Sequence, residues 1–172
     1  MKNWADSVSK IIMWIFVAIA AGIAIFYLTF AIGMVHSNSK KSISSSLISE
    51  YKAELSNNFN KLAVDNVNMY YQQGHLFTDI KLKNDLTFED SKAIAKSLKD
   101  FILKAEVQEY FVKKFGDSLQ PNIKLSIHAS NGEYYYHSPY YLPEGNPPIE
   151  SNYKLWYLEK ESGETIQTLN ID

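Results

Sequence analysis

The sequence predicts an α+β protein, in which a single N-terminal transmembrane helix precedes a small domain with a mostly antiparallel sheet and two helices. Residues 11–35 are uncharged and almost entirely apolar. Further along the 172-residue chain, two segments repeat apolar residues at three- and four-residue steps, as helices do, and several short segments alternate apolar and polar residues, as half-buried strands do. The part after the apolar run is long enough for one compact core.

The apolar run at 11–35 is longer than the roughly 20 helical residues that cross a bilayer. A cleaved signal peptide has a shorter apolar core, of about 7–15 residues, and a buried helix of this length is unexpected in so small a protein. We therefore expect a permanent anchor. Residues 1–10 form a short cytoplasmic segment, 36–46 form a serine-rich tether, and 47–172 form the α+β domain.

The lysines on the two sides of the anchor are nearly balanced, so the positive-inside rule alone does not decide orientation. Lys2 and Lys10 precede the run, and Lys40, Lys41 and Lys52 follow it. We expect the N-terminus inside and the domain outside.

Composition disfavours several classes of function. All 17 basic residues are lysine and the net charge is −2, so a nucleic-acid reader, which uses arginine and a basic stripe, is not expected. Without cysteine there is no disulfide and no thiolate metal site. A nucleophile elbow and a glycine-rich phosphate loop are also lacking. We expect no enzymatic activity and no cofactor.

Small residues lie along one stripe of the apolar helix. Ala18, Gly22, Thr29 and Gly33 share this stripe, and small residues let helix backbones approach closely in lipid. The pattern predicts a self-association face. Alanine and glycine are also common in membrane spans, and that is the alternative explanation.

The first half of the domain predicts two helices and a strand. Apolar residues from Leu47 to about Tyr71 follow a helical period, with Gly74 as the stop. Residues 76–82 alternate as a strand. A second helix follows the cap residue Thr87, and it reaches Gly116 unless 107–112 forms a strand.

The second half predicts two hairpins. Residues 123–129 alternate, and Asn131-Gly132 favours a two-residue type I′ turn that places Ala129 opposite Tyr134. This register makes His128 and His137 diagonal neighbours. Two histidines without a third ligand are a weak metal site, so we expect surface histidines and no metal.

A proline-rich loop at 139–148 leads to a second hairpin formed by 153–160 and 165–171. Aromatic residues crowd this half of the chain. Some must be core, but exposed rings beside such a loop would form a protein-binding surface. The candidate partner-binding aromatics are Tyr135, Tyr140, Tyr141 and Trp156.

Residues 127–136, together with 141–143, 147–150 and 152–153, resemble the hairpin region of the T-even-type phage holins. The resemblance implies a protein of the bacterial inner membrane that assembles into lesions, through which a cytoplasmic endolysin reaches the cell wall. It also implies a periplasmic domain bound by an antiholin. The periplasmic cysteines of that family are missing here, so the domain is expected to be held by its core alone.

The leading hypothesis is therefore a homo-oligomeric phage holin. One alternative is a bitopic accessory or scaffold protein of a bacterial secretion or conjugation apparatus. Another is an extracytoplasmic sensor module, which would need a partner for signalling because no output domain follows the sheet.

Overall fold

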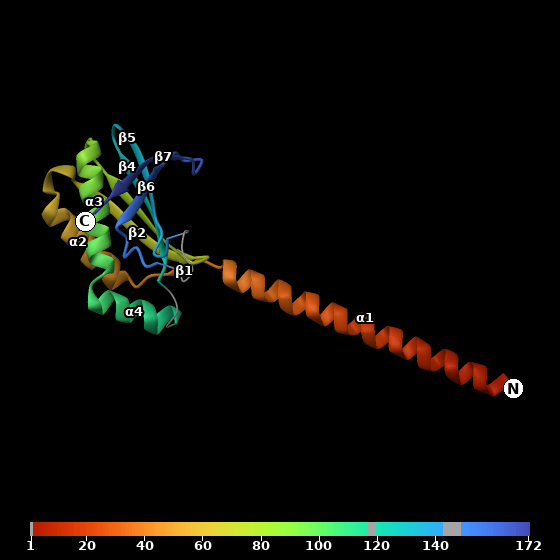
Figure 1. Cartoon of the computed structure of the whole chain (residues 1–172). Coiled ribbons are helices and arrows are strands. Elements are labelled where there is room, and N and C mark those ends of the chain that lie inside the picture. The colour runs from red at the N-terminus through yellow and green to blue at the C-terminus, as the bar shows by residue number, and fades with distance from the viewer. Residues whose placement is uncertain (1, 117–119, 143–148) are drawn as a thin grey trace. The chain divides into compact units, whose positions relative to one another are not determined.

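The computed structural model describes residues 2–116, 120–142 and 149–172 (Figure 1). The chain divides into two units, one ending at Ser39 and the other extending from Lys40 to Asp172. The first unit is a single helix and the second is an α+β domain, as the sequence predicts.

Helix α1 runs from Lys2 to Asn38 and contains the expected apolar segment. Its stretch Ile12–Ala31 is long and apolar enough to cross a membrane, and none of it is buried. Among the described side chains, the first member of the buried domain core is Ile43.

The serine-rich tether expected at 36–46 is largely structured. Helix α1 continues to Asn38, strand β1 occupies Lys41–Ser42, and helix α2 begins at Ser45. The cause is local, because Ile43 is buried and the Ser44 hydroxyl accepts a hydrogen bond from the Leu47 amide as the N-cap of α2.

The helix expected to reach Tyr71 ends much earlier, so that prediction is wrong. Helix α2 spans Ser45–Asn58, a 3₁₀ turn covers Asn60–Leu62, and strand β2 spans Val64–Gln72. Ala63 has a left-handed φ of 48°, which breaks the helical path. Beyond it, Val67, Met69 and Tyr71 are buried at two-residue spacing, which is the period of a strand.

The domain is built on one seven-stranded sheet in the order β1-β2-β3-β4-β5-β6-β7. Strands β3 and β4 are parallel, and every other neighbouring pair is antiparallel. The remaining strands are β3 at His75–Leu82, β4 at Asn122–Ala129, β5 at Gly132–Ser138, β6 at Leu155–Glu159 and β7 at Thr165–Asn170. The second expected hairpin is present as β6 and β7.

Two helices connect the parallel strands. Helix α3 spans Phe88–Ile102 and helix α4 spans Ala105–Phe115, so the single second helix expected from the sequence is divided near Leu103. The predicted cap is confirmed, because the Thr87 hydroxyl accepts a hydrogen bond from the Asp90 amide at 3.1 Å. Residues 107–112 lie in α4 and are not a strand.

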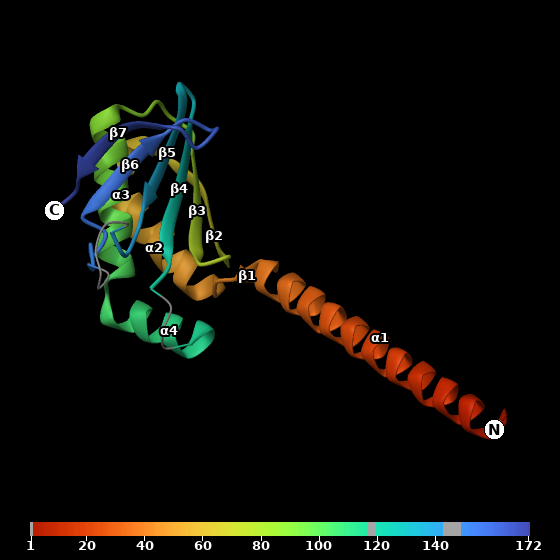
Figure 2. The same cartoon turned by 45° about the vertical axis from the view of Figure 1, so that its right-hand side comes forward.

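Helices α2 and α3 pack against one face of the sheet (Figure 2). Tyr51 and Leu55 of α2 and Ile94 and Leu98 of α3 are completely or almost completely buried there. A hydrogen bond of 2.6 Å between the Ser91 and Tyr136 hydroxyls links α3 to β5 in the core. The strands contribute their alternate side chains to this face: Leu76, Ile80, Ile123, Leu125, Ile127, Tyr136 and Trp156.

The β4–β5 hairpin forms where expected but in another register. Ala129 pairs with Gly132 and Ile127 with Tyr134, so Ser130 and Asn131 are the turn. The Asn131 side chain accepts a hydrogen bond from the Leu86 amide at 2.9 Å and donates one to the Leu86 carbonyl at 3.1 Å. These two bonds hold Asn131 in the turn. The shift is two residues, so each side chain keeps its face and changes its partner.

Strand β7 contains a bulge at the edge of the sheet. Leu158 pairs with Gln167, but Glu159 pairs with Thr165, which leaves Ile166 as an extra residue with 58% of its surface exposed. At the other edge, β1 pairs only with Tyr70 and Tyr71 of β2.

The anchoring role of Asn131 predicts a clear loss of stability. Replacing Asn131 by alanine removes two hydrogen bonds to Leu86 and should lower the free energy of unfolding by about 1–3 kcal/mol. Chemical denaturation of the full chain in detergent micelles, followed by near-UV circular dichroism, measures this. Ser162→Ala in the exposed β6–β7 turn is the control and should change stability by less than about 0.5 kcal/mol. Equal stabilities would show that these bonds do not fix the turn.

Candidate functional site

The face of the sheet opposite α2 and α3 carries a mixed aromatic and charged surface, which we call the open face. No helix among the described residues packs on it. One row of neighbouring residues crosses five strands in register, from β2 to β6. The row consists of Tyr70, Phe77, Lys124, His137 and Tyr157. The rings of Tyr70 and Phe77 stack at a centroid distance of 4.9 Å.

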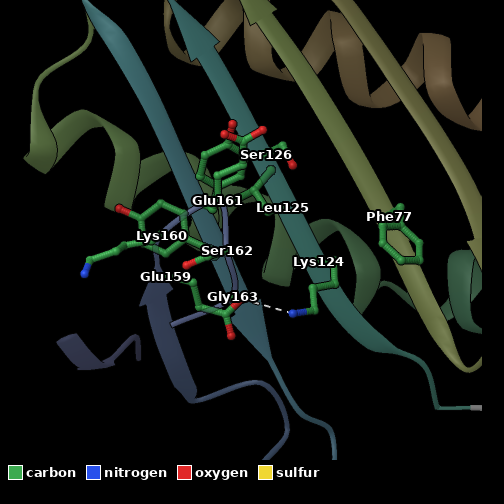
Figure 3. A pocket seen from close by; sticks show the side chains of 11 residues that line it. Phe77, Lys124, Leu125, Ser126, Glu159, Lys160, Glu161, Ser162 and Gly163 are labelled. Carbon is green, nitrogen blue, oxygen red and sulfur yellow. Dashed lines mark hydrogen bonds and ion pairs between the residues drawn. The ribbon is translucent and has the colours of Figure 1, made fainter. Parts of the chain in front are cut away.

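Glu159 is the charged centre of the open face. Its side chain is only 10% exposed, and its two oxygens contact different side chains. Oε2 lies 3.0 Å from Lys124 Nζ, and Oε1 lies 3.4 Å from His137 Nδ1. Figure 3 shows the Lys124–Glu159 contact. The carboxylate therefore links β4, β5 and β6 through side chains.

His137 lies in a half-buried position beside a second histidine. Its ring is 6.0 Å from the rings of both His75 and Tyr157, and its Nε2 is buried without a hydrogen-bond partner among the described residues. Burial lowers the pKa of His137 below its ordinary value of 6.5, and Lys124 and His75 lower it further, while Glu159 acts in the opposite direction. The imidazole is therefore mainly neutral near pH 7.

A shallow hollow of about 200 Å³ lies next to this cluster (Figure 3). Phe77, Lys124, Tyr135 and Glu159 line it together with the β6–β7 turn at 160–163. Ligand pockets for drug-sized molecules are usually larger, at about 300–1,000 Å³. The hollow is suited to one protruding side chain with a polar end, because aromatic rings and an ion pair lie side by side.

A second polar group lies farther along the same hairpin. Glu133 accepts hydrogen bonds from the Tyr135 hydroxyl and contacts His128 Nδ1 at 2.8 Å. The bond to Glu133 raises the pKa of Tyr135 to about 12, and burial adds to the effect. Tyr135 is therefore a neutral donor at physiological pH.

The expectation that His128 and His137 are diagonal neighbours is wrong. His137 pairs with Lys124, whereas His128 pairs with Glu133 four residues further along β4. The altered register of the turn separates them. Within the described ranges, no three His, Asp or Glu side chains converge as metal ligands.

The candidate aromatics do not form one surface. Trp156 is fully buried, with its Nε1 donating to the Tyr153 carbonyl at 2.7 Å, and Tyr140 is 7% exposed. The structure places both in the core rather than on a partner-binding surface. Tyr135 lies on the open face, and Tyr141 is 45% exposed next to 143–148, the part of the proline-rich loop that lies outside the described residues.

Sequence reasoning missed Phe77, His75, Lys124 and Glu159 as parts of a site. One signal was present, because Phe77 is an aromatic residue on the polar side of an alternating strand. The ion pair had no signal, since Lys124 and Glu159 are far apart in the chain.

The small-residue stripe of α1 is exposed at Ala18, Gly22 and Thr29. The Thr29 hydroxyl donates to the carbonyls of Ile25 and Phe26 within the same helix. Gly33 lies in α1, but its surroundings fall outside the described residues. A Cβ atom added at Gly22 would have no described atom within 4 Å beyond its neighbours and the helix's own backbone.

Comparison with protein-family models, with curated proteins and with solved structures finds no match to this chain. Functional interpretation therefore depends on the helix and on the open face.

The charges around His137 predict opposite shifts in two variants. In the full chain in detergent micelles, NMR titration should give His137 a midpoint below 6.5. Lys124→Gln should raise this midpoint, because it removes a repelling cation. Glu159→Gln should lower it, because it removes an attracting anion. Shifts in the reverse directions would contradict the arrangement.

Protonation of His137 should also make the stability of the domain depend on pH. Because His137 has a lowered pKa in the folded state, the unfolded chain binds more protons between that pKa and 6.5. The free energy of unfolding should fall as pH falls through this window. His137→Gln should reduce the slope, and an unchanged slope would count against the lowered pKa.

Proposed function

We propose that this chain is a single-pass inner-membrane protein that oligomerises through α1 and forms lesions at host lysis, as phage holins do. In this proposal the domain lies in the periplasm and an antiholin binds it. The observation that carries the proposal is the exposed, uncharged stretch Ile12–Ala31. None of this stretch is buried, so its apolar surface is available to lipid and to other copies.

The chemistry of α1 supports association rather than transport. In lipid, helices associate through close packing, and the stripe with Ala18 and Gly22 offers this. The span contains no charged residue, and ion or proton pathways through membranes use such residues. Assembly of many copies is the function for which this helix is suited.

The open face supports regulation by a protein. Lys124 and Glu159 form a partly desolvated ion pair beside stacked aromatic rings, and aromatic residues are enriched at binding hot spots. A partner side chain in the 200 Å³ hollow would contact both. An antiholin bound there would regulate assembly of the chain by binding to it, without any chemical reaction.

Inducing the full chain in a bacterium tests the lesion proposal. We expect an abrupt loss of membrane potential, followed by lysis when an endolysin is co-expressed. Continued growth at high expression would overturn the proposal. In that case the second candidate, a bitopic scaffold or sensor, is favoured by the open face, where the Tyr70 and Phe77 rings stack and Lys124 pairs with Glu159.

The small-residue stripe predicts a position-specific effect on assembly. Gly22→Ile should delay or abolish the loss of membrane potential, because it blocks close approach while leaving the isolated helix undisturbed. Ala20→Ile, on the opposite side of α1, is the matched control and should have little effect. Cross-linking in membranes measures the oligomers directly. Equal effects of the two variants would exclude this stripe as the interface.

A further inference from the structure

The first residues after α1 pack on the domain and are hydrogen-bonded to the end of α4. Residues 40–44, which we call the strap, include β1 and the buried Ile43. The Ser44 amide donates to the Tyr110 hydroxyl at 2.9 Å. Lys114 Nζ donates to the Ser42 carbonyl at 2.7 Å. The end of α4 therefore lies beside the strap.

Four exposed lysines gather on the strap and on the end of α4. They are Lys40, Lys41, Lys113 and Lys114, which we call the basic patch. Within the described part of the chain, none of them has a carboxylate at ion-pair distance. Several other lysines do have such partners: Lys61, Lys83, Lys92, Lys104, Lys124 and Lys160. Among the described residues, the four positive charges of the basic patch therefore have no carboxylate partner.

Aromatic rings lie beneath three of these ammonium groups. Lys40 Nζ lies 4.4 Å from the centre of the Tyr70 ring, and Lys114 Nζ lies 5.4 Å from that of Tyr110. Lys41 Nζ lies 6.0 Å from the Phe115 ring. The neighbouring Val112 is 39% exposed. Lysines over aromatic rings, next to an exposed apolar side chain, are the composition found at a membrane–water interface.

Chain length keeps the basic patch near the bilayer. Only Ser39 separates the end of α1 from Lys40, so Lys40 is within about 12 Å of the last apolar residue of the run, Val35. Lys114 is also held near the bilayer, because its Nζ is hydrogen-bonded to Ser42 of the strap. The headgroup region is several ångströms thick on each side of the apolar core. A lysine whose backbone lies just outside that core can therefore reach lipid phosphates with its long side chain.

We propose that the basic patch binds the headgroups of anionic phospholipids in the leaflet from which α1 emerges. The phosphate oxygens would replace the carboxylates that these lysines lack, and Val112 would contact the lipid interface. The nearest described acidic residue on α4 is Glu109, one turn before Lys113. The proposal rests on α1 spanning the membrane, and it is independent of lesion formation.

Each lysine near an anionic surface strengthens such binding about fivefold. The attraction acts over about 10 Å at 0.1 M salt and over about 3 Å at 1 M. Docking of the patch should therefore depend on both lipid charge and salt.

The test uses the full chain reconstituted into vesicles. Because the chain has no cysteine, Val112→Cys accepts a single environment-sensitive fluorophore. In vesicles of equal parts phosphatidylglycerol and phosphatidylcholine, we expect a blue-shifted emission that lipid-borne quenchers reduce. In phosphatidylcholine alone, or at about 1 M salt, the shift should be lost. Soluble glycerol phosphate at constant ionic strength should not reverse it, which distinguishes a membrane surface from a free anion.

The variant Lys40, Lys41 and Lys113→Gln should lose the shift, and it keeps the Lys114 bond that fastens the strap. The control Lys81, Lys83 and Lys154→Gln removes the same charge elsewhere and should keep it. Equal emission in charged and neutral vesicles, or equal loss in both triple variants, would overturn the proposal. Retention of the protein in vesicles after an alkaline wash reports separately on the membrane span. Loss of the protein from the vesicles in that wash would contradict the proposal that α1 spans the membrane, on which lipid binding by the basic patch rests.

Discussion

Parallel pairing of β3 with β4 requires the chain to return along the sheet between them, and this requirement shapes the whole domain. The connection is made by α3 and α4, and α3 packs on the same face as α2. All three large apolar surfaces, from the sheet, α2 and α3, are thereby used on one side. The opposite side is left to polar and aromatic residues, which is why the open face exists.

The features that could be predicted from the sequence are those that depend on residues close together in the chain. The cap at Thr87, the alternation at 76–82 and the apolar run of α1 each depend on neighbouring residues, and all three appear where expected. Strand β2 was not predicted, because its buried apolar residues continue the helix-like spacing of apolar residues that begins in α2. The left-handed Ala63 that separates the two elements is not a residue type that marks a turn.

Long-range contacts account for the other differences. The turn at Asn131 follows from its bonds to Leu86, which lies 45 residues earlier. The Lys124–Glu159 pair needs the order β4-β5-β6 and the register of both hairpins before the two side chains meet. Trp156 is an aromatic residue of the kind found in binding surfaces, yet its ring is fully buried beside Tyr136. Composition shows that such residues exist, and only the fold shows which of them meet.

The bulge at Ile166 has a consequence for contacts between molecules. A straight, uncharged strand at the border of a sheet can pair with the same strand of another copy, and repeated pairing of this kind builds fibrils. The extra residue in β7 interrupts that border. On the far side, Lys52 donates to the Asp65 carbonyl and occupies one acceptor of β2. Both edges of the sheet are thereby less open to strand pairing between molecules, even where many copies lie close together.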